Sequence, residues 1–343
     1  MIKVISIIIT LVFTSFYFFP IEFKFLPGAN TKMVMAGCGL LLLGIKLAKQ
    51  RLPEVKKDVF ILSMIAALVS LCGIFSAFYN NTPDFTYATY IVSMWVWMAG
   101  AYLLLELIKA VHNGFVSLFL LGNYLIAVCV MQCLLALVID YSVSFEYAVN
   151  RVVMGLDFVN NDVLSETGRL YGIGASLDVA GIRFSAILIM ITYLCVIMSH
   201  RLKSWHYVLY IAAFVIIGVV GNIMSRTTTV GVILALVYLI YSMFNTKTHD
   251  GGSRFTKWLI SMLLVFIPVV VLLYYVDPQM RENLRFGFEG FFSLAESGTW
   301  TVHSNEILKN MIVWPDNLKT WLIGDGYIVN PNVTDPYYIG PIW

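Results

Sequence analysis

The sequence VGNIMSRTTTVG, from Val220 to Gly231, places a short polar segment between two long apolar ones. Residues Tyr207–Met224 form the apolar run before the polar residues, and Val230–Phe244 form the run after them. Arg226 therefore lies where two long apolar runs meet, with almost no loop to carry it away from the membrane surface. An arginine in this position is either a solvated charge at a helix end or a fixed binding group for an anion.

The composition indicates a membrane protein. Hydrophobic residues make up 59% of the 343 residues, charged residues only 12%, and the mean hydropathy is +0.82. A soluble domain carries about a quarter charged residues, so a soluble core could not enclose this much apolar surface. No basic run or basic face occurs outside a few short loops, and we therefore expect no nucleic-acid partner.

Nine apolar runs are long enough to cross, or nearly cross, a hydrocarbon core of about 30 Å. Backbone in lipid must satisfy its own hydrogen bonds, and no barrel pattern is visible, so we expect an all-α polytopic membrane protein. The first run ends in an aromatic cluster, which favours a transmembrane helix over a cleaved signal peptide. The first, second and eighth runs are short. The runs are Val4–Phe19, Met33–Ala48, Val59–Phe78, Ala88–Leu105, Phe115–Ile139, Ile182–Met198, Tyr207–Met224, Val230–Phe244 and Trp258–Val276.

The basic residues predict an orientation. Of the 22 lysines and arginines, 12 lie at the N-terminus or in the short connections after the second, fourth, sixth and eighth runs. The connection Tyr79–Thr86, on the other side, has no basic residue. The positive-inside rule therefore predicts a cytoplasmic N-terminus and places two long segments, residues 140–181 and 277–343, on the outward side.

The two long segments hold most of the outward polar chemistry. Loops of this length are usually functional or disordered. Their aromatic residues and turn signals, such as Trp314-Pro315-Asp316-Asn317 and Gly324-Asp325-Gly326, indicate ordered structure. We expect residues 1–343 to form one membrane domain. Because the sequence stops inside the second segment, with no return helix, we also expect further C-terminal helices to be missing from it.

Three arginines are predicted to share the outward face. Arg169 lies in the glycine-flanked sequence TGRLYG, Arg183 opens the sixth apolar run, and Arg226 lies in the polar segment. Arginine suits a diphosphate because its planar fork is always charged and bonds two oxygens at once. A single arginine at a helix end could equally snorkel to the interface. Three on one face favour a diphosphate site.

His303 and Glu306 are candidate general bases. On a helix they share one face with Asn310, and the apolar residues of the opposite face could lie on the membrane. Histidine or glutamate in this place could deprotonate a sugar hydroxyl. The alternative is an ordinary polar pair on a surface helix. A zinc site is disfavoured because no third ligand follows at motif spacing.

The remaining motifs point to no cofactor. All five cysteines fall inside apolar runs, which favours packing over a disulfide or a metal cluster. The sequence GDGY at 324–327 is a turn, since no strand precedes it and no helix pattern follows, and no nucleotide-binding motif is present. This disfavours an ATP-driven transporter and a glycosyltransferase that uses nucleotide sugars.

These pieces together resemble the O-antigen polymerase and O-antigen ligase family of bacterial envelope glycosyltransferases. The resemblance covers the layout of most of the chain, although its motifs are short. The matching pieces are residues 168–172 leading into Arg183, Ser225-Arg226-Thr227 between two helices, and the Thr301–Pro315 helix followed by LIGDGY at 322–327. Members of the family have further helices after the large outward loop, in agreement with a truncated C-terminus.

The resemblance implies a membrane glycosyltransferase of the GT-C type in the bacterial inner membrane. It implies inverting, metal-independent transfer on the periplasmic face, with a glycan on undecaprenyl diphosphate as donor and another lipid-linked repeat unit as acceptor. Arg169, Arg183 and Arg226 are expected to hold the diphosphate, and His303 or Glu306 to activate the acceptor hydroxyl. Besides membrane lipid and the lipid-linked oligosaccharide, a chain-length regulator is a candidate partner.

Two alternatives stay open. An O-antigen ligase is one, but its spaced histidine-glycine signature is not clear after His303, which favours a polymerase. A lipid-linked oligosaccharide flippase is the other. A flippase predicts polar residues through the full membrane depth, whereas the charged residues here concentrate at helix ends. A sensor or structural membrane protein would not need the outward arginines.

Overall fold

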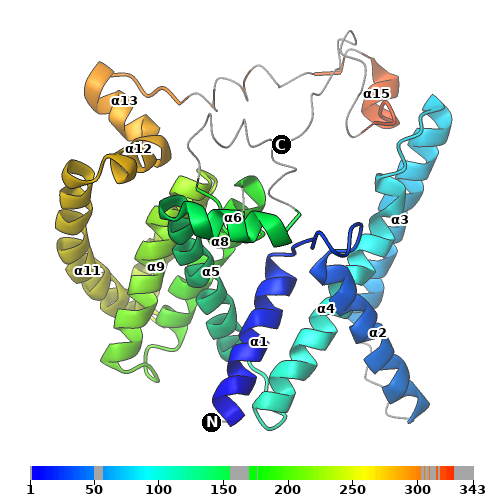
Figure 1. Ribbon diagram of the computed structural model, residues 1–343, viewed down its shortest axis with the longest axis horizontal. Coiled ribbons are helices and arrows are strands. Elements are labelled where there is room, and N and C mark those ends of the chain that lie inside the picture. Colours follow the sequence, from blue (N-terminus) through cyan, green and yellow to red (C-terminus); the bar gives the residue numbers. More distant parts are fainter. Residues whose placement is uncertain are drawn as a thin grey trace. The chain divides into compact units, whose positions relative to one another are not determined.

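The chain is an all-helical polytopic membrane protein. The computed structural model (Figure 1) describes residues 2–49, 57–154, 170–175, 177–302, 305, 309, 314–315 and 317–327. Apart from two isolated β-bridges, these residues form no strand. The elements are α1 (Ile2–Phe18), α2 (Thr31–Ala48), α3 (Lys57–Asn80), η1 (Tyr87–Thr89), α4 (Tyr90–Val111), α5 (Leu118–Tyr141), α6 (Val143–Val152), α8 (Leu177–Ile197), α9 (Ser204–Met224), α10 (Thr228–Phe244), α11 (His249–Val276), α12 (Pro278–Gly287), α13 (Glu289–Ser297) and α15 (Leu318–Leu322).

Each of the nine apolar runs lies mostly within one helix. Within the described residues, seven helices are long and apolar enough to cross a membrane: α2, α3, α4 with η1, α5, α8, α9 and α11. The other two, α1 and α10, are apolar helices of 17 residues each. These correspond to the first and eighth runs, two of the three that are short in the sequence. The second run, the other short one, belongs to α2, whose 18 residues are long enough.

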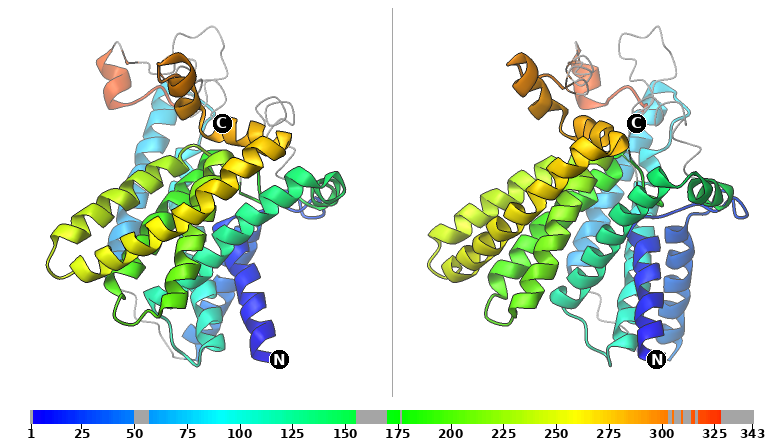
Figure 2. Two further views of the ribbon diagram at one scale, coloured as in Figure 1. Left: turned by 90° about the vertical axis from the view of Figure 1, so that its left-hand side faces the viewer. Right: turned by 60° about the vertical axis from the view of Figure 1, so that its left-hand side comes forward.

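The described parts of the two long connecting segments contain helices. Helix α6 follows the end of α5, and α12 and α13 follow α11. Asp277 caps α12, since its carboxylate accepts hydrogen bonds from the backbone N–H groups of Gln279 and Met280. Figure 2 shows α6 almost end-on while α5 runs lengthwise, so α6 lies across the end of the bundle.

The chain divides into two compact units. One comprises Met1–Thr31 and Leu104–Trp300, and the other Lys32–Leu103 and Thr301–Trp343. The boundary falls inside α4, between Leu103 and Leu104. A single membrane domain over residues 1–343 stays a prediction.

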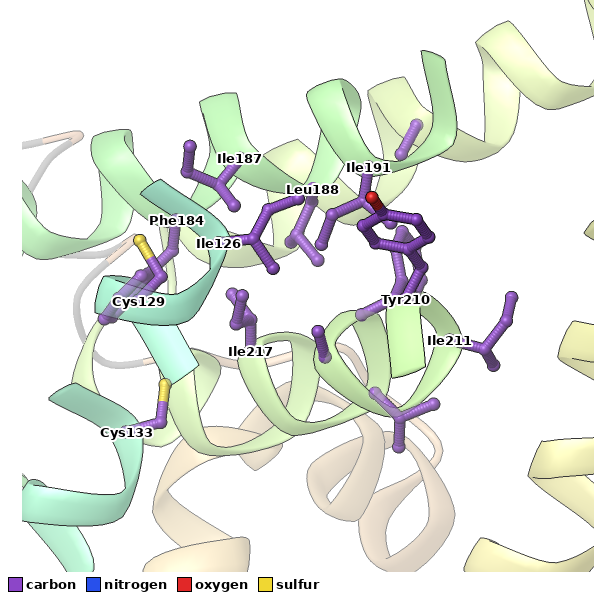
Figure 3. Packing of buried hydrophobic residues seen from close by; sticks show 14 of the residues in the cluster. Ile126, Cys129, Cys133, Phe184, Ile187, Leu188, Ile191, Tyr210, Ile211 and Ile217 are labelled. Carbon is purple, nitrogen blue, oxygen red and sulfur yellow. The ribbon is translucent and has the colours of Figure 1, made fainter. Parts of the chain in front are cut away.

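Helix α9 is the centre of the first unit. It contacts α5, α8, α10, α11 and α12, and it is apolar all round, as a helix surrounded by other helices should be. Its neighbours α5 and α8 supply most of the other core side chains (Figure 3). Cys129 and Cys133 of α5 are buried in this core among isoleucine and phenylalanine side chains, where they act as small packing residues.

Glycines allow the helices of this unit to approach closely. A Cβ atom on Gly231 of α10 would overlap Ser185 of α8, and one on Gly251 of α11 would stand 2.9 Å from the carbonyl carbon of Val196. Small residues have this role in membrane bundles, where apolar burial alone does not hold helices together. Helix α11 also begins nine residues before the apolar run that starts at Trp258, because its polar first turns pack against α8 and α10.

The second unit joins α2, α3 and part of α4 to the last described segment. Gly39 of α2 lies against the backbone of Ala99 in α4. The Asn80 amide donates a hydrogen bond to the Gly324 carbonyl at 3.0 Å, and the Thr82 hydroxyl donates one to the Gly326 carbonyl at 2.7 Å. Both glycines have positive φ, which confirms the turn predicted for the GDG sequence.

Candidate functional site

The polar segment Ser225-Arg226-Thr227 is a tight turn between α9 and α10. Met224 ends α9, Ser225 is extended at φ −156°, and Thr228 begins α10. The Thr228 hydroxyl donates a hydrogen bond to the Gly221 carbonyl at 2.9 Å. This bond satisfies one carbonyl of the last turn of α9, so a side chain at the start of α10 closes the end of α9.

Helix α8 supports the turn through small residues. The Ser185 hydroxyl donates to the Thr227 carbonyl at 3.0 Å. One helical turn earlier, Gly181 faces Ser225, and a Cβ atom there would lie 2.8 Å from the Thr227 Cβ as well as overlapping the Ser225 hydroxyl. The turn therefore sits directly on α8, and Arg226 is carried by a backbone that cannot shift freely.

Arg226 itself is held by α12 and α13. Its Nη2 atom lies 2.6 Å from Glu289 Oε2, and its Nε–H donates to the Phe286 carbonyl at 3.3 Å. The guanidinium also lies over the Phe286 ring, 4.3 Å from its centroid. Only 20% of the Arg226 side chain is exposed. This arginine is a partly buried, positioned cation, and it does not extend freely into solvent.

Asn222 connects three helices beside this cation. Its amide donates to the Gly287 carbonyl at the end of α12 at 2.7 Å, and its carbonyl accepts from the Thr229 hydroxyl of α10 at 2.6 Å. Gly287 lies close enough to Ile223 that a Cβ atom would stand 2.9 Å from its Cγ1. Asn222 is buried, and both ends of its amide are bonded, so it fixes α12 over the end of α9.

Arg183 is placed differently from the expectation that it opens its helix. Helix α8 begins at Leu177, so Arg183 lies six residues inside it. The side chain is half-buried, and its guanidinium lies 5.6 Å and 5.3 Å from the ring centroids of Phe18 and Phe19 at the end of α1. Because neighbouring Gly181 touches Ser225, Arg183 is at the same end of the bundle as Arg226. The two arginines nevertheless meet different partners.

The residues after Arg169 line a small cavity at this end of the bundle. Leu170 and Tyr171 enclose about 90 Å³ together with Ala136, Ile139, Asp140 and Glu146. The Tyr171 hydroxyl donates to Glu146 at 2.8 Å. Burial is the main cause that raises the pKa of Tyr171 far above its usual value, and the hydrogen bond to the Glu146 carboxylate is the second cause. The Tyr171 hydroxyl therefore stays a neutral donor.

Helix α12 is hydrogen-bonded to Asp140, which lines the same cavity. Asn283 donates to Asp140 Oδ2 at 2.8 Å, and the Gln279 amide donates to the Asp140 carbonyl at 2.8 Å. The Tyr141 hydroxyl donates to Asp277, and this bond is the main reason that the pKa of Asp277 is below its ordinary value. These contacts connect the end of α5 through α12 to Arg226.

Three of the predicted site residues lie outside the described residues. They are Arg169, in the first long segment, and His303 and Glu306, in the second. The roles assigned to them stay predictions. Leu170, next to Arg169, is buried in the core of the first unit.

No family model, curated protein or solved structure matches this chain.

The arrangement can bind an anion at the end of an apolar bundle. A guanidinium has five N–H donors and can bridge a carboxylate and a phosphate at once. Within the described residues, no group of three histidine, cysteine or acidic side chains is placed to hold a metal ion. Sequence reasoning missed Glu289, because no spacing rule links it to Arg226, and it missed the role of Asn222 for the same reason.

Proposed function

We propose that this protein is a polysaccharide polymerase that joins undecaprenyl-diphosphate-linked repeat units by inverting, metal-independent glycosyl transfer. The observation that carries the proposal is Arg226, a partly buried guanidinium on a tight turn at the end of an apolar helix bundle. A charge in this position is costly for a membrane protein and is a functional candidate by default. Arg183 at the same end adds a second cation.

The proposed topology places this end of the bundle on the periplasmic face. All nine apolar helices would span the bacterial inner membrane, with a cytoplasmic N-terminus, as in membrane glycosyltransferases of the GT-C type. The distribution of basic residues supports this orientation. A site at the bundle end also fits a donor whose isoprenoid chain remains in the bilayer while its diphosphate and sugars remain in water.

The arginines would act on the leaving group. When the glycosidic bond to the carrier breaks, negative charge grows on the diphosphate, and a fixed cation stabilises that charge more in the transition state than in the ground state. Arg226 meets the requirement of preorganisation because Phe286 and Glu289 already orient its guanidinium. Arg169 and Arg183 would complete the diphosphate site.

The acceptor hydroxyl needs a base. We assign this role to His303 or Glu306 in the second long segment, as the family resemblance implies. Single alanine variants of each separate the two candidates, because only the true base should be required for chain growth. If both variants make polymer of normal length, the base lies elsewhere in the chain.

The glycan profile of a strain lacking the gene tests the proposed activity against its alternatives. Loss of a polymerase leaves single repeat units on the finished lipid product. Loss of a ligase instead leaves full-length polymer on the carrier, and loss of a flippase leaves carrier-linked units in the cytoplasm. Either of the last two profiles would overturn the polymerase assignment.

A further inference from the structure

A second cavity lies at the other end of the same helices. It encloses about 360 Å³ between the α8–α9 connection and the first turns of α11. The residues that line it are Ser199, His200, His249, Asp250, Ser253, Arg254 and Lys257. Every one of these side chains is polar, whereas the helices around the cavity are apolar. A ligand of this cavity would therefore meet only polar side chains.

The cavity is cationic. Arg254 and Lys257 carry two positive charges against the single negative charge of Asp250. The charged side chains are exposed, so a ligand can reach them. The cavity also lies at the N-terminus of α11, a helix of 28 residues, where the backbone dipole favours an anion. Side-chain charge and helix dipole therefore have the same sign here.

Close helix packing and hydrogen bonds position Arg254 and His249 in this cavity. Gly251 and Gly252 allow the start of α11 to pack closely against Val196 of α8 and Ser242 of α10. Arg254 donates through Nη1 to the Ser199 carbonyl at 3.1 Å. His249 Nδ1 lies 2.6 Å from the Met243 carbonyl, so Nδ1 carries the hydrogen and donates it. These contacts set the cavity wall before any ligand arrives.

A metal ion is a poor fit for this cavity. Although two histidines and an aspartate line it, the described residues contain no group of three such side chains placed to hold a metal. The arginine and lysine would also repel a cation. An anion with several oxygen acceptors suits the same set of donors.

We propose that this cavity binds a phosphate group. It lies at a level marked by Trp205 in the first turn of α9 and Trp258 in α11, and tryptophan favours the membrane interface. The phosphate can thus come from the headgroup of an anionic phospholipid or from solution. The cavity is distinct from the site at Arg226, because α11 extends for roughly 40 Å between His249 and α12 at 1.5 Å per residue (Figure 2).

The test titrates the purified protein with phosphatidylglycerol, and separately with inorganic phosphate, and counts bound ligand by native mass spectrometry. We expect the double variant Arg254→Gln with Lys257→Gln to bind about tenfold more weakly than wild type. Ser253→Asp, which adds a negative charge to the cavity without removing the Arg254–Ser199 contact, should weaken binding as much. The matched control is Arg201→Gln, which removes a cation from the same connection but does not line the cavity.

The ligand that responds identifies the source of the phosphate. Weakening of phosphatidylglycerol binding alone assigns a lipid headgroup, and weakening of inorganic phosphate binding assigns free phosphate. The proposal is overturned if neither ligand binds the wild type. It is also overturned if each ligand that binds the wild type binds the cavity variants as tightly as it binds Arg201→Gln. Thermal unfolding of each variant checks that the bundle is intact, and Ser253→Asp decides the question if the double variant does not fold.

Discussion

Arg226 Nη2 and Glu289 Oε2 lie 2.6 Å apart, although one residue is at the centre of the α9–α10 turn and the other begins α13. Exposure of the two side chains is 20% and 33%, so water screens this pair only partly. A diphosphate that reaches Arg226 must share the guanidinium with Glu289. The carboxylate thus orients the arginine and at the same time competes with the proposed ligand.

Replacing Arg226 by lysine should reduce polymer formation at least about tenfold, because lysine keeps the charge but loses the fork that bonds two oxygens. The measurement is the chain-length distribution of surface glycan in a complemented deletion strain. Arg285→Lys is the matched control, since Arg285 pairs with Glu296 on the exposed surface and such pairs contribute little. Normal chain lengths in Arg226→Lys would contradict the role of the fork.

Glu289→Gln separates ligand binding from a purely structural pairing. Removing the carboxylate removes the competitor, so the variant should bind undecaprenyl diphosphate as tightly as wild type or more tightly. It should also lower the free energy of unfolding by about 1 kcal/mol, the order expected for a half-buried pair. Binding by the purified protein and thermal unfolding in detergent measure the two effects. Loss of binding in proportion to loss of stability would mean that Arg226 serves only to hold Glu289.

Gly181→Ala should displace the turn that carries Arg226. The new Cβ would lie 2.8 Å from the Thr227 Cβ and overlap the Ser225 hydroxyl, and overpacking of this kind costs about 1–3 kcal/mol. Polymer formation should fall with it. Gly44→Ala in α2 is the control, because no atom lies within 4 Å of the new Cβ and alanine favours a helix. Equal unfolding temperatures for the two variants would show that the α8 contact does not constrain the turn.

Asp277 should make the protein less stable in acid. Its pKa is lowered in the folded protein, chiefly by the Tyr141 hydroxyl, so the stability it contributes is present above the usual carboxyl pKa of about 4 and is lost as the pH falls below it. Asparagine also caps helices well, so Asp277→Asn keeps the α12 cap but removes the titration. Unfolding temperatures between about pH 5 and pH 3 should therefore fall more steeply for wild type than for the variant. Parallel curves would rule out this contribution.

The helices of this protein could be predicted from hydropathy alone, because lipid leaves an apolar run no other backbone partner. The ends of the helices could not be predicted from hydropathy. Arg183 lies six residues inside α8, and α11 begins at His249, because tertiary packing keeps polar and glycine residues helical beyond the apolar run. Among the described residues, the helices of the first and eighth runs fall short of membrane length, as the sequence indicated, whereas the second run, which also looked short, belongs to a helix of 18 residues that is long enough.

The candidate site was predictable in part. The position of Arg226 between two apolar runs left open a solvated charge or a fixed binding group, and in the structure its side chain is partly buried and paired with Glu289. Its partners could not be predicted, since Phe286 and Glu289 reach it only through the folding of α12 over α9. Contacts between residues far apart in sequence carry no local signal, and the same holds for Asp140 with Asn283.

The most direct test of the central claim is polymerisation by the purified protein in lipid vesicles. The substrate is the carrier-linked repeat unit extracted from a strain that lacks the gene, supplied with a metal chelator and without nucleotide sugar. The wild-type protein should convert single units into a ladder of longer carrier-linked oligomers, and Arg226→Gln should leave them single. Units that stay single with the wild-type protein, or a ladder that is equally long with Arg226→Gln, would contradict the account.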